Sequence, residues 1–279
     1  MSWLNNRSLN VMIEASTLPD FHIVIPARFA SQRFPQKLMA DLGGKPVLQW
    51  VHELSLKAGA KSVTIATDHQ TIFDAAEAFG ARVVMTRDDH ENGTERLAEV
   101  ASHMAWMGDE IVVNVQGDEP FLPVTLIHAT VNALVRDNES AMATVACAID
   151  DMKDYLSPNV VKVVCDAKQR ALYFSRAPIP YDRDGLAKVT QSNQVSGSLP
   201  LDLPVMRHIG LYVYRASLLN KYVELPVSPL ERWEKLEQLR FLHLGIKVQV
   251  AIADSLPSHG VDTPEDLEKL RHHLTTEND

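Results

Sequence analysis

Three cationic side chains, Arg28, Arg33 and Lys37, follow an apolar run near the start of the chain. The run, residues 21–25, is typical of a buried first strand, and we expect it to stop at Pro26, which cannot donate to a sheet ladder. The loop after such a strand is a usual ligand site in α/β proteins, and guanidinium and ammonium groups there suit phosphate. We therefore predict that this loop binds the triphosphate of a nucleotide.

The charge of this segment is opposite to that of the whole chain. Between Pro26 and Pro46 there are four Lys or Arg residues and one Asp, whereas the 279 residues together carry a net charge of −9. That acidic balance argues against a surface that coats nucleic acid, because phosphate-backbone binding draws mainly on Lys and Arg. Neither G-x-x-x-x-G-K-[ST] nor G-x-G-x-x-G is present, so cationic side chains must hold the phosphates. The alternative is an ordinary solvated loop.

Two aspartates, Asp118 and Asp262, are the candidate metal ligands. Each follows a predicted buried strand and a glycine, and Mg²⁺ is commonly held by one or two carboxylates together with phosphate oxygens and water. For Asp262 the alternative is capping of the final helix. His208 and His259 lack zinc-site spacing, and no G-x-S-x-G supports a hydrolytic triad.

The order of predicted elements indicates an α/β fold. Strands and helices alternate from Phe21 to Ile149, which predicts a three-layer architecture with a mostly parallel central sheet. In this part Thr94 is expected to cap a helix. Residues 160–176 predict an antiparallel hairpin within a small antiparallel subdomain over 150–220. Residues 21–279 are expected to form a single domain.

Two segments are expected to lie outside regular structure, and one further helix is predicted near the carboxyl end. Residues 1–20 predict a flexible N-terminal extension, and the polar segment 182–206 predicts a mobile lid. A single helix from Pro229 would place four large apolar residues on one side, namely Leu230, Trp233, Leu236 and Leu239.

Cysteine usage and hydropathy favour a cytoplasmic protein. Cys147 and Cys165 each lie in an apolar run without metal-ligand spacing, which predicts buried, reduced thiols. No apolar run approaches the roughly 20 residues of a membrane span, and the N-terminal stretch has no continuous apolar core. We therefore expect neither a membrane nor a nucleic acid as partner.

Nine segments, in order from Phe21 to about Leu274, resemble the 3-deoxy-manno-octulosonate cytidylyltransferase family. They are IPARFASQRFPQK, IATD, DHENGTERLAEV, VNVQGDEP, VKVV, ALYFSRAPIPYDRD, RHIGLYVYR, SPLERWEKLEQLR and GVDTPEDLEKLR. The resemblance implies a nucleotide-diphospho-sugar transferase-like architecture and cytidylyl transfer from CTP to 3-deoxy-manno-octulosonate (Kdo), with release of pyrophosphate. It also implies Mg²⁺ as cofactor, and a cytoplasmic homodimer that feeds lipopolysaccharide synthesis, with residues 150–220 capping the sugar site and aiding dimerisation.

The resemblance assigns roles to individual residues. Catalytic roles fall on Arg28, Lys37 and Asp118, and metal binding falls on Asp118 and Asp262. Nucleotide contacts fall on Ala27, Arg28, Arg33, Lys37, His90, Asn92, Gly93 and Thr94. Sugar contacts fall on Arg96, Gln116, Arg176, His208, Tyr212, Glu234, Glu237 and Gln238. Gln36 stands where the family usually has glycine before the lysine, which leaves the backbone conformation of this loop open.

The expected chemistry brings two anions together. CTP carries about four negative charges and the sugar acid one, so metal and loop cations must offset their repulsion, and Arg96 or Arg176 suits the sugar carboxylate. The sugar's anomeric hydroxyl would attack the α-phosphorus in line, and no general base is identified. The alternatives are a CTP-dependent transferase for sialic acid, a glycosyltransferase that consumes nucleotide-sugars, and a non-catalytic nucleotide sensor.

Overall fold

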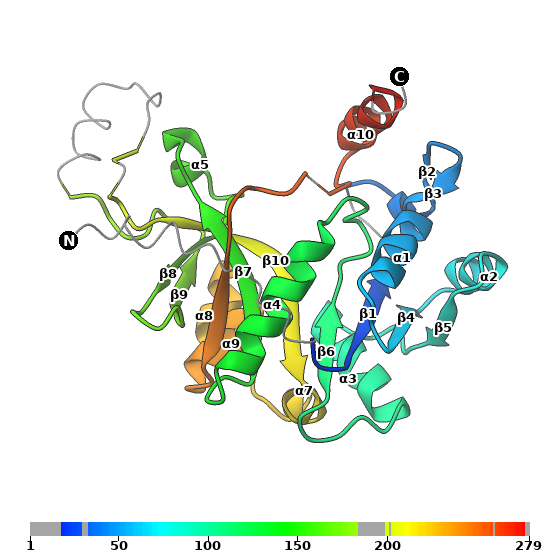
Figure 1. The fold of residues 1–279 in the computed structure, drawn as a ribbon, viewed down its shortest axis with the longest axis horizontal. Helices are drawn as coiled ribbons and strands as arrows, with labels where there is room; N and C mark the ends of the chain where they lie inside the picture. The colour runs from blue at the N-terminus through cyan, green and yellow to red at the C-terminus, as the bar shows by residue number, and fades with distance from the viewer. Residues whose placement is uncertain (1–17, 30–32, 184–198, 201, 259, 277–279) are drawn as a thin grey trace. The chain divides into compact units, whose positions relative to one another are not determined.

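The computed structural model describes residues 18–29, 33–183, 199–200, 202–258 and 260–276 (Figure 1). Most of the predicted flexible extension over 1–20, and much of the predicted lid over 182–206, lie outside the described residues. The chain divides into two compact units. The larger unit consists of residues 20–143, 210–225 and 257–279, and the smaller unit includes 144–209 and 226–256.

A mostly parallel sheet forms the centre of the larger unit. Strand β1 (Phe21–Ala27) pairs in parallel with β4 (Ser62–Thr67) on one side and with β6 (Ile111–Asn114) on the other. β4 also pairs in parallel with β5 (Arg82–Met85), and the last part of β10 (Met206–Arg215) runs antiparallel to β6. All seven residues of β1 are buried, as an apolar run between two neighbours requires. The predicted α/β fold is confirmed.

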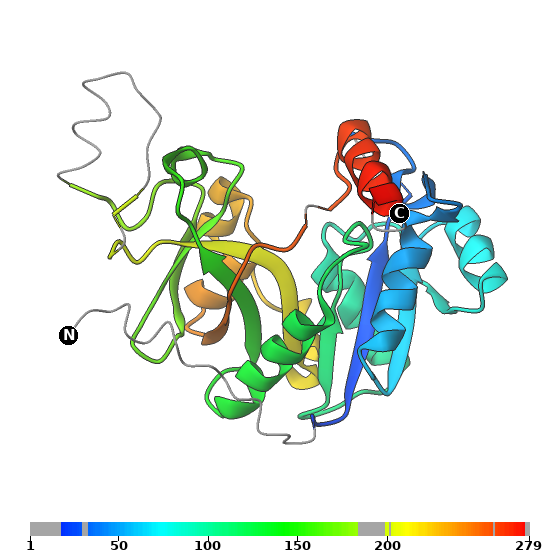
Figure 2. The ribbon, with the colours of Figure 1, turned by 45° about the horizontal axis from the view of Figure 1, so that its top comes forward.

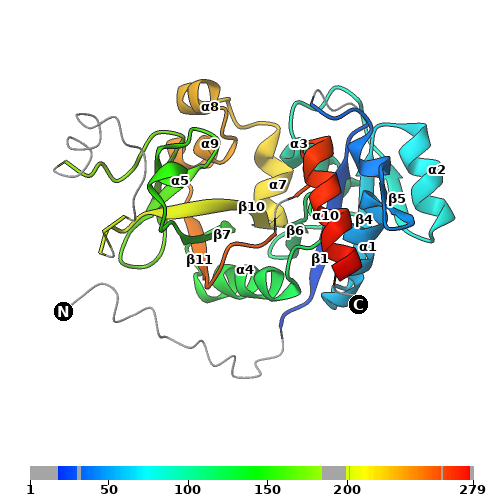
Figure 3. The same cartoon turned by 90° about the horizontal axis from the view of Figure 1, so that it is seen from above.

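Helices cover both faces of this sheet, which gives the three layers. Figure 3 shows α1 (Val47–Lys57) and α4 (Val124–Arg136) on one face, with α3 (Gly93–His103) and α7 (Ala216–Tyr222) on the other. α2 (Gln70–Ala78) packs against β4 and β5 at the edge of the sheet. Helices that alternate with parallel strands must bury their apolar stripes on the sheet, so both faces are covered.

A small hairpin and the last helix complete the larger unit. β2 (Asp41–Leu42) and β3 (Lys45–Pro46) form the hairpin, and a one-turn helix, η2 (Lys37–Met39), precedes it. α10 (Pro264–Thr276) packs on β2 through Leu267 and Leu270, which join Leu42 in one buried cluster (Figure 2). This packing fixes the segment that leads into α10.

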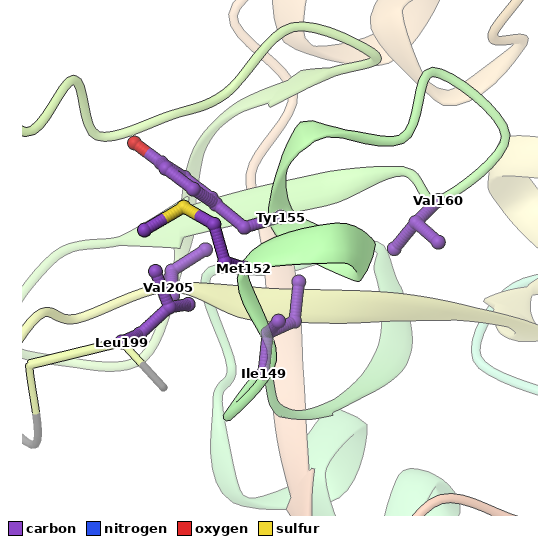
Figure 4. Packing of buried hydrophobic residues seen from close by; sticks show 6 residues of the cluster. All are labelled: Ile149, Met152, Tyr155, Val160, Leu199 and Val205. Carbon is purple, nitrogen blue, oxygen red and sulfur yellow. The ribbon is translucent and has the colours of Figure 1, made fainter. Parts of the chain in front are cut away.

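The smaller unit contains the predicted antiparallel hairpin. It is formed by β8 (Lys162–Cys165) and β9 (Ala171–Ser175), and the first part of β10 pairs with β8. β7 (Met142–Ala148) continues into this unit and pairs with β11 (Val248–Ala253). α5 (Met152–Leu156) contributes Met152 and Tyr155 to a buried cluster whose other members are Ile149, Val160, Leu199 and Val205 (Figure 4).

Two local predictions are wrong. β1 does not stop at Pro26 but continues to Ala27, because the β6 ladder ends opposite Val24 and the missing N–H of Pro26 leaves no bond unmade on that side. Thr94 does not cap α3. Asn92 is the cap, and its side chain accepts from the backbone N–H of Glu95 at 2.9 Å.

The single helix predicted from Pro229 is also wrong. The segment forms two short helices, α8 (Pro229–Glu234) and α9 (Gln238–His243), because Lys235 adopts a left-handed conformation with φ of 55°. Leu236 and Leu239 are buried, whereas Leu230 and Trp233 are exposed, Trp233 to 89%. The break changes the direction of the chain after Glu234, so the apolar stripe is not continuous.

Cys147 is buried, Cys165 is half-buried, and both are free thiols. Within the part of the chain that the structure describes, none of the helices has the length and apolarity that crossing a bilayer requires.

Candidate active site

The Lys37 ammonium lies between the two aspartates that the sequence singled out. Nζ is 2.5 Å from Asp118 Oδ2 and 3.0 Å from Asp262 Oδ1, and Arg33 Nη2 lies 3.0 Å from the same Asp262 oxygen. Burial lowers the pKa of Lys37, but the two carboxylates outweigh it and the net pKa is raised. The structure therefore brings together one predicted catalytic cation, one supporting cation and both predicted metal ligands.

Backbone segments from β1, from the loop after β6 and from the stretch before α10 approach one another closely in this arrangement. A Cβ on Gly260 would lie 2.8 Å from the Asp118 carbonyl oxygen, and one on Gly117 would lie 2.9 Å from the Pro26 carbonyl oxygen. The Val261 N–H donates to the same Asp118 oxygen at 2.8 Å. Only glycine permits backbones to come so near. These glycines were not predicted as site residues, although Gly117 directly precedes Asp118 and Gly260 lies two residues before Asp262.

The capping alternative for Asp262 does not hold. The Asp266 N–H donates to Thr263 Oγ1 at 3.2 Å, and the Asp266 carboxylate accepts from the Thr263 N–H at 3.0 Å. This reciprocal pair satisfies the start of α10. Asp262 is left to face Lys37 and Arg33.

Glu119 is the group in this site whose proton affinity is most changed. Burial first, and then the neighbouring Asp118 and Asp262 carboxylates, raise the pKa of Glu119 to about 8 against the opposing effect of Lys37. Burial and like charges nearby both disfavour ionisation, so Glu119 holds its proton more tightly than an exposed glutamate does. The sequence signalled it only by its position beside Asp118.

The two aspartates fit a magnesium ion. Among the described residues no group of three or more His, Cys, Asp or Glu side chains is suitably placed to hold a metal. Mg²⁺ does not need such a cage, since it is commonly bound by one or two carboxylates with substrate phosphates and water. The pair already attracts the Lys37 ammonium, which shows that its field favours a cation.

Arg28 lies beside the predicted nucleotide loop. Its Nη2 donates to the His90 carbonyl oxygen at 2.6 Å. The His90 ring is buried and contacts the Glu99 carboxylate through Nε2, while Nδ1 lies 3.7 Å from Glu95. Glu99, which the sequence did not single out, thus holds the ring whose backbone receives Arg28.

The rest of this loop is fixed on the end of β1. A Cβ on Gly93 would lie 3.6 Å from Pro26, and Thr94 is buried with its hydroxyl 3.1 Å from that of Tyr214. Ala27, the last residue of β1, is also buried. The predicted nucleotide residues from the two segments therefore lie next to each other at the carboxyl end of the sheet, where α/β proteins bind ligands.

Gln36, at the position where the resemblance implies a glycine, takes a backbone conformation that favours glycine. Its φ is 57° and its ψ is 25°, in the left-handed region, directly before Lys37. A non-glycine residue there costs roughly 1–2 kcal/mol. The loop thus retains the glycine-type turn despite the substitution.

Three predicted sugar residues belong to the larger unit. Arg96 is completely buried, and its guanidinium contacts Asp68 Oδ2 at 2.6 Å and the Thr86 hydroxyl. Gln116 follows β6, and the buried Tyr212 pairs with Asn114 across β10 and β6. Arg96 holds the loops after β4 and β5 together, and a sugar contact by any of the three stays a prediction.

The other predicted sugar residues belong to the smaller unit. Arg176 and Glu234 contact each other, since the Arg176 N–H donates to Glu234 Oε2 at 2.9 Å and Nε donates to the Glu234 carbonyl oxygen at 2.8 Å. His208 Nε2 lies 2.9 Å from the Thr144 hydroxyl, and burial lowers its pKa to about 3. Glu237 and Gln238 stand at the start of α9.

Comparisons with known proteins give the family. A model described as cytidylyltransferase matches residues 22–248. A 3-deoxy-manno-octulosonate cytidylyltransferase from a Marinomonas species is 76% identical over 93% of this chain and 97% of the relative. The chain belongs to the 3-deoxy-manno-octulosonate cytidylyltransferase family. A relative with the same name from Photobacterium profundum is 51% identical over 90% of this chain and 98% of its own length.

Solved structures agree with the assignment to this cytidylyltransferase family. A CMP:2-keto-3-deoxy-manno-octonic acid synthetase complexed with CTP is 38% identical, with a TM-score of 0.81, over 93% of this chain and 100% of that one. A 4-diphosphocytidyl-2C-methyl-D-erythritol synthase from Anaerococcus prevotii has a TM-score of 0.56 at 15% identity, which shows a shared fold alone.

Gly260, where the segment before α10 approaches Asp118, gives a first test. Gly260→Ala should lower turnover at least about tenfold, because a misplacement of about 1 Å can cost 10²-fold, and the added methyl would displace backbone at Asp118. Gly210→Ala is the matched control, since a Cβ there meets nothing within 4 Å. Wild-type turnover of the Gly260 variant would show that the close approach does not set the aspartates.

Glu119 gives a pH-dependent prediction for stability. Its pKa is raised from 4.5 to about 8 in the folded protein, so between these values the folded state binds the extra proton. The free energy of unfolding should therefore fall as pH rises from about 5 to about 8, by about 1.4 kcal/mol per unit of pKa difference. Urea denaturation in chelator measures this.

In Glu119→Gln this fall should be reduced, whereas the exposed Glu91→Gln should behave as wild type. An equal pH dependence in Glu119→Gln and wild type would contradict the raised pKa.

Proposed function

We propose that this chain transfers the cytidylyl group of CTP to Kdo and releases pyrophosphate. The observation that carries the proposal is the Lys37 ammonium held by Asp118 and Asp262, beside a loop with Arg28, in a chain 76% identical to a relative named for this reaction. A site with closely spaced cations and carboxylates suits a polyphosphate with a divalent ion.

The proposed reaction breaks a phosphoanhydride bond of CTP and forms a phosphate ester to the sugar. The anomeric hydroxyl oxygen of Kdo forms a bond to the α-phosphorus of CTP, and the bond from that phosphorus to the bridging oxygen breaks. Pyrophosphate leaves with the electron pair, and the hydroxyl proton passes to solvent. Arg28, Arg33 and Lys37 would stabilise charge on the phosphates, so the chain acts mainly through position and electrostatics.

Magnesium is the proposed cofactor, held by Asp118 and Asp262. When bound, it would offset phosphate charge and lower the pKa of the attacking hydroxyl. Lys37 now lies between these carboxylates, so we expect its ammonium to turn toward the phosphates when the ion is present. Glu119 would either keep its proton or lose it and contribute an oxygen to the ion, according to the net charge of the neighbouring groups.

The sugar carboxylate is proposed to bind a guanidinium group. Arg176 suits this better than Arg96, because Arg96 is completely buried and already paired with Asp68, whereas Arg176 is only half-buried. Glu234, which accepts the hydrogen bond of the Arg176 N–H, is proposed to bind sugar hydroxyls. His208, Tyr212 and Gln238 are proposed as further sugar contacts.

The cytoplasm and a homodimer are proposed as the setting of the reaction. Both substrates are small, charged metabolites, and the two thiols are free, as is usual in a reducing compartment. The exposed Trp233 and Leu230 on α8 are apolar groups that a partner copy would cover.

Pyrophosphate release tests the proposed reaction. The protein should release pyrophosphate with CTP, Kdo and Mg²⁺ together, and chelation of Mg²⁺ should abolish the release. Replacing Kdo by sialic acid should reduce the rate strongly, because sialic acid is larger. Faster turnover with sialic acid would transfer the assignment to that sugar. Consumption of a UDP- or CMP-sugar without CTP would indicate a glycosyltransferase, and CTP binding without any turnover would indicate a sensor.

Lys37 gives a sharper test of the same site. Lys37→Ala should lower turnover about 10²-fold or more, as does loss of other groups that stabilise transition-state charge. Lys45→Ala is the matched control from the same positive segment, because Lys45 Nζ pairs with Glu53 at 2.8 Å. Wild-type turnover in the Lys37 variant would remove this residue from the mechanism.

A further inference from the structure

Lys162 is a completely buried lysine in strand β8 of the smaller unit. Its ammonium donates to three backbone carbonyl oxygens, those of Ser157 at 2.9 Å, Val160 at 2.6 Å and Arg176 at 2.6 Å. An ammonium has three donors, so this set uses them all. Burial of a charge is costly unless it is fully hydrogen-bonded, and three carbonyl dipoles provide that compensation here.

The three carbonyls come from two segments that flank the hairpin, one before β8 and one after β9. Ser157 and Val160 belong to the turn after α5, which the buried cluster around Tyr155 fixes (Figure 4). The third carbonyl, that of Arg176, follows directly after β9. Lys162 therefore ties the turn to the exit of the hairpin through its side chain, at the end of the β8–β9 ladder where its backbone pairs with Ser175.

Arg176 depends on both of these segments. Its Nη1 donates to the Pro158 carbonyl oxygen at 2.9 Å, within the same turn, and its Nε donates to the Glu234 carbonyl oxygen at 2.8 Å. Its N–H and the Ser175 hydroxyl both donate to the Glu234 carboxylate, at 2.9 Å and 2.6 Å. The direction of the guanidinium is thus set by the turn and by the backbone that Lys162 holds.

We propose that Lys162 is a positioning residue for the sugar acid, acting through Arg176 and Glu234 rather than by contact with substrate. This rests on the proposed function, in which Arg176 receives the carboxylate of the sugar. A neutral, unbranched side chain such as that of methionine would fill most of the space but would not hold the three carbonyls. Arg176 would then lose its fixed direction, and affinity for a carboxylate-bearing sugar would fall while the CTP site stayed intact.

The charge on Lys162 is itself sensitive to pH. Burial lowers the pKa of Lys162 to about 8, Glu234 and Asp154 oppose this shift, and Arg176 adds to it. Arg207, opposite Lys162 on β10, pairs with Asp154 at 3.1 Å. As the pH rises past about 8 the ammonium loses its proton and one donor, so its hold on the carbonyls weakens.

The test compares Lys162→Met with the exposed Lys153→Met, using pyrophosphate release at varied Kdo and varied CTP. We expect Lys162→Met to raise the KM for Kdo at least about tenfold, with the KM for CTP changed less than about twofold, and Lys153→Met to match wild type. In wild type the KM for Kdo should rise between about pH 7 and pH 9, and this rise should be absent from Lys162→Met.

Several outcomes would overturn the proposal. An unchanged KM for Kdo in a folded Lys162→Met, or equal increases in both KM values, would show a merely structural role. If this variant does not fold, the wild-type pH profile decides, and a KM for Kdo that stays level through pH 9 rejects the role of Lys162. Absence of pyrophosphate release from wild type with CTP and Kdo would reject the proposed function itself, together with this inference.

Discussion

Electrostatic attraction between one ammonium and two carboxylates is the interaction on which the candidate active site depends. Lys37 reaches Asp118 and Asp262 from a loop after β1, while the aspartates come from the loop after β6 and from the segment before α10. Three parts of the chain are held together by one small cluster of charge. In an overall acidic protein, this cluster of opposite charges suits the proposed ligand, a nucleotide with a divalent ion, which interacts with both signs.

The sheet makes that cluster possible. Parallel strands end at the same edge, so the ends of β1 and β6 are neighbours, and Gly117 allows the loop after β6 to approach Pro26 closely. Gly260 allows the segment before α10 to approach Asp118 in the same way. Glu119 is buried in this site beside the Asp118 and Asp262 carboxylates, and burial first, then the two like charges, raise its pKa. The close packing of these backbone segments and the raised pKa of Glu119 therefore have the same origin.

A second polar cluster, in the smaller unit, has a different character. Lys162 meets backbone carbonyls rather than carboxylates, and its role is to hold Arg176 and Glu234 in place. Such a group does not need to touch a substrate to affect binding, because a guanidinium recognises a carboxylate only when its planar fork is oriented. The contacts that orient Arg176 thus matter as much for recognition of a carboxylate as Arg176 itself.

The sequence by itself determined the fold class, the first cluster's members and the family. Apolar runs indicate the buried strands, and an aspartate that follows a strand and a glycine is recognised from the local sequence alone. Nine ordered segments resembled one family. Tertiary structure decided what depends on contacts between distant segments, namely that Asp262 faces Lys37 rather than capping α10, that Arg96 is buried against Asp68, and that Lys162 holds Arg176. Local patterns fix which residues are near a strand end, whereas pairing, burial and pKa depend on neighbours that only the folded chain supplies.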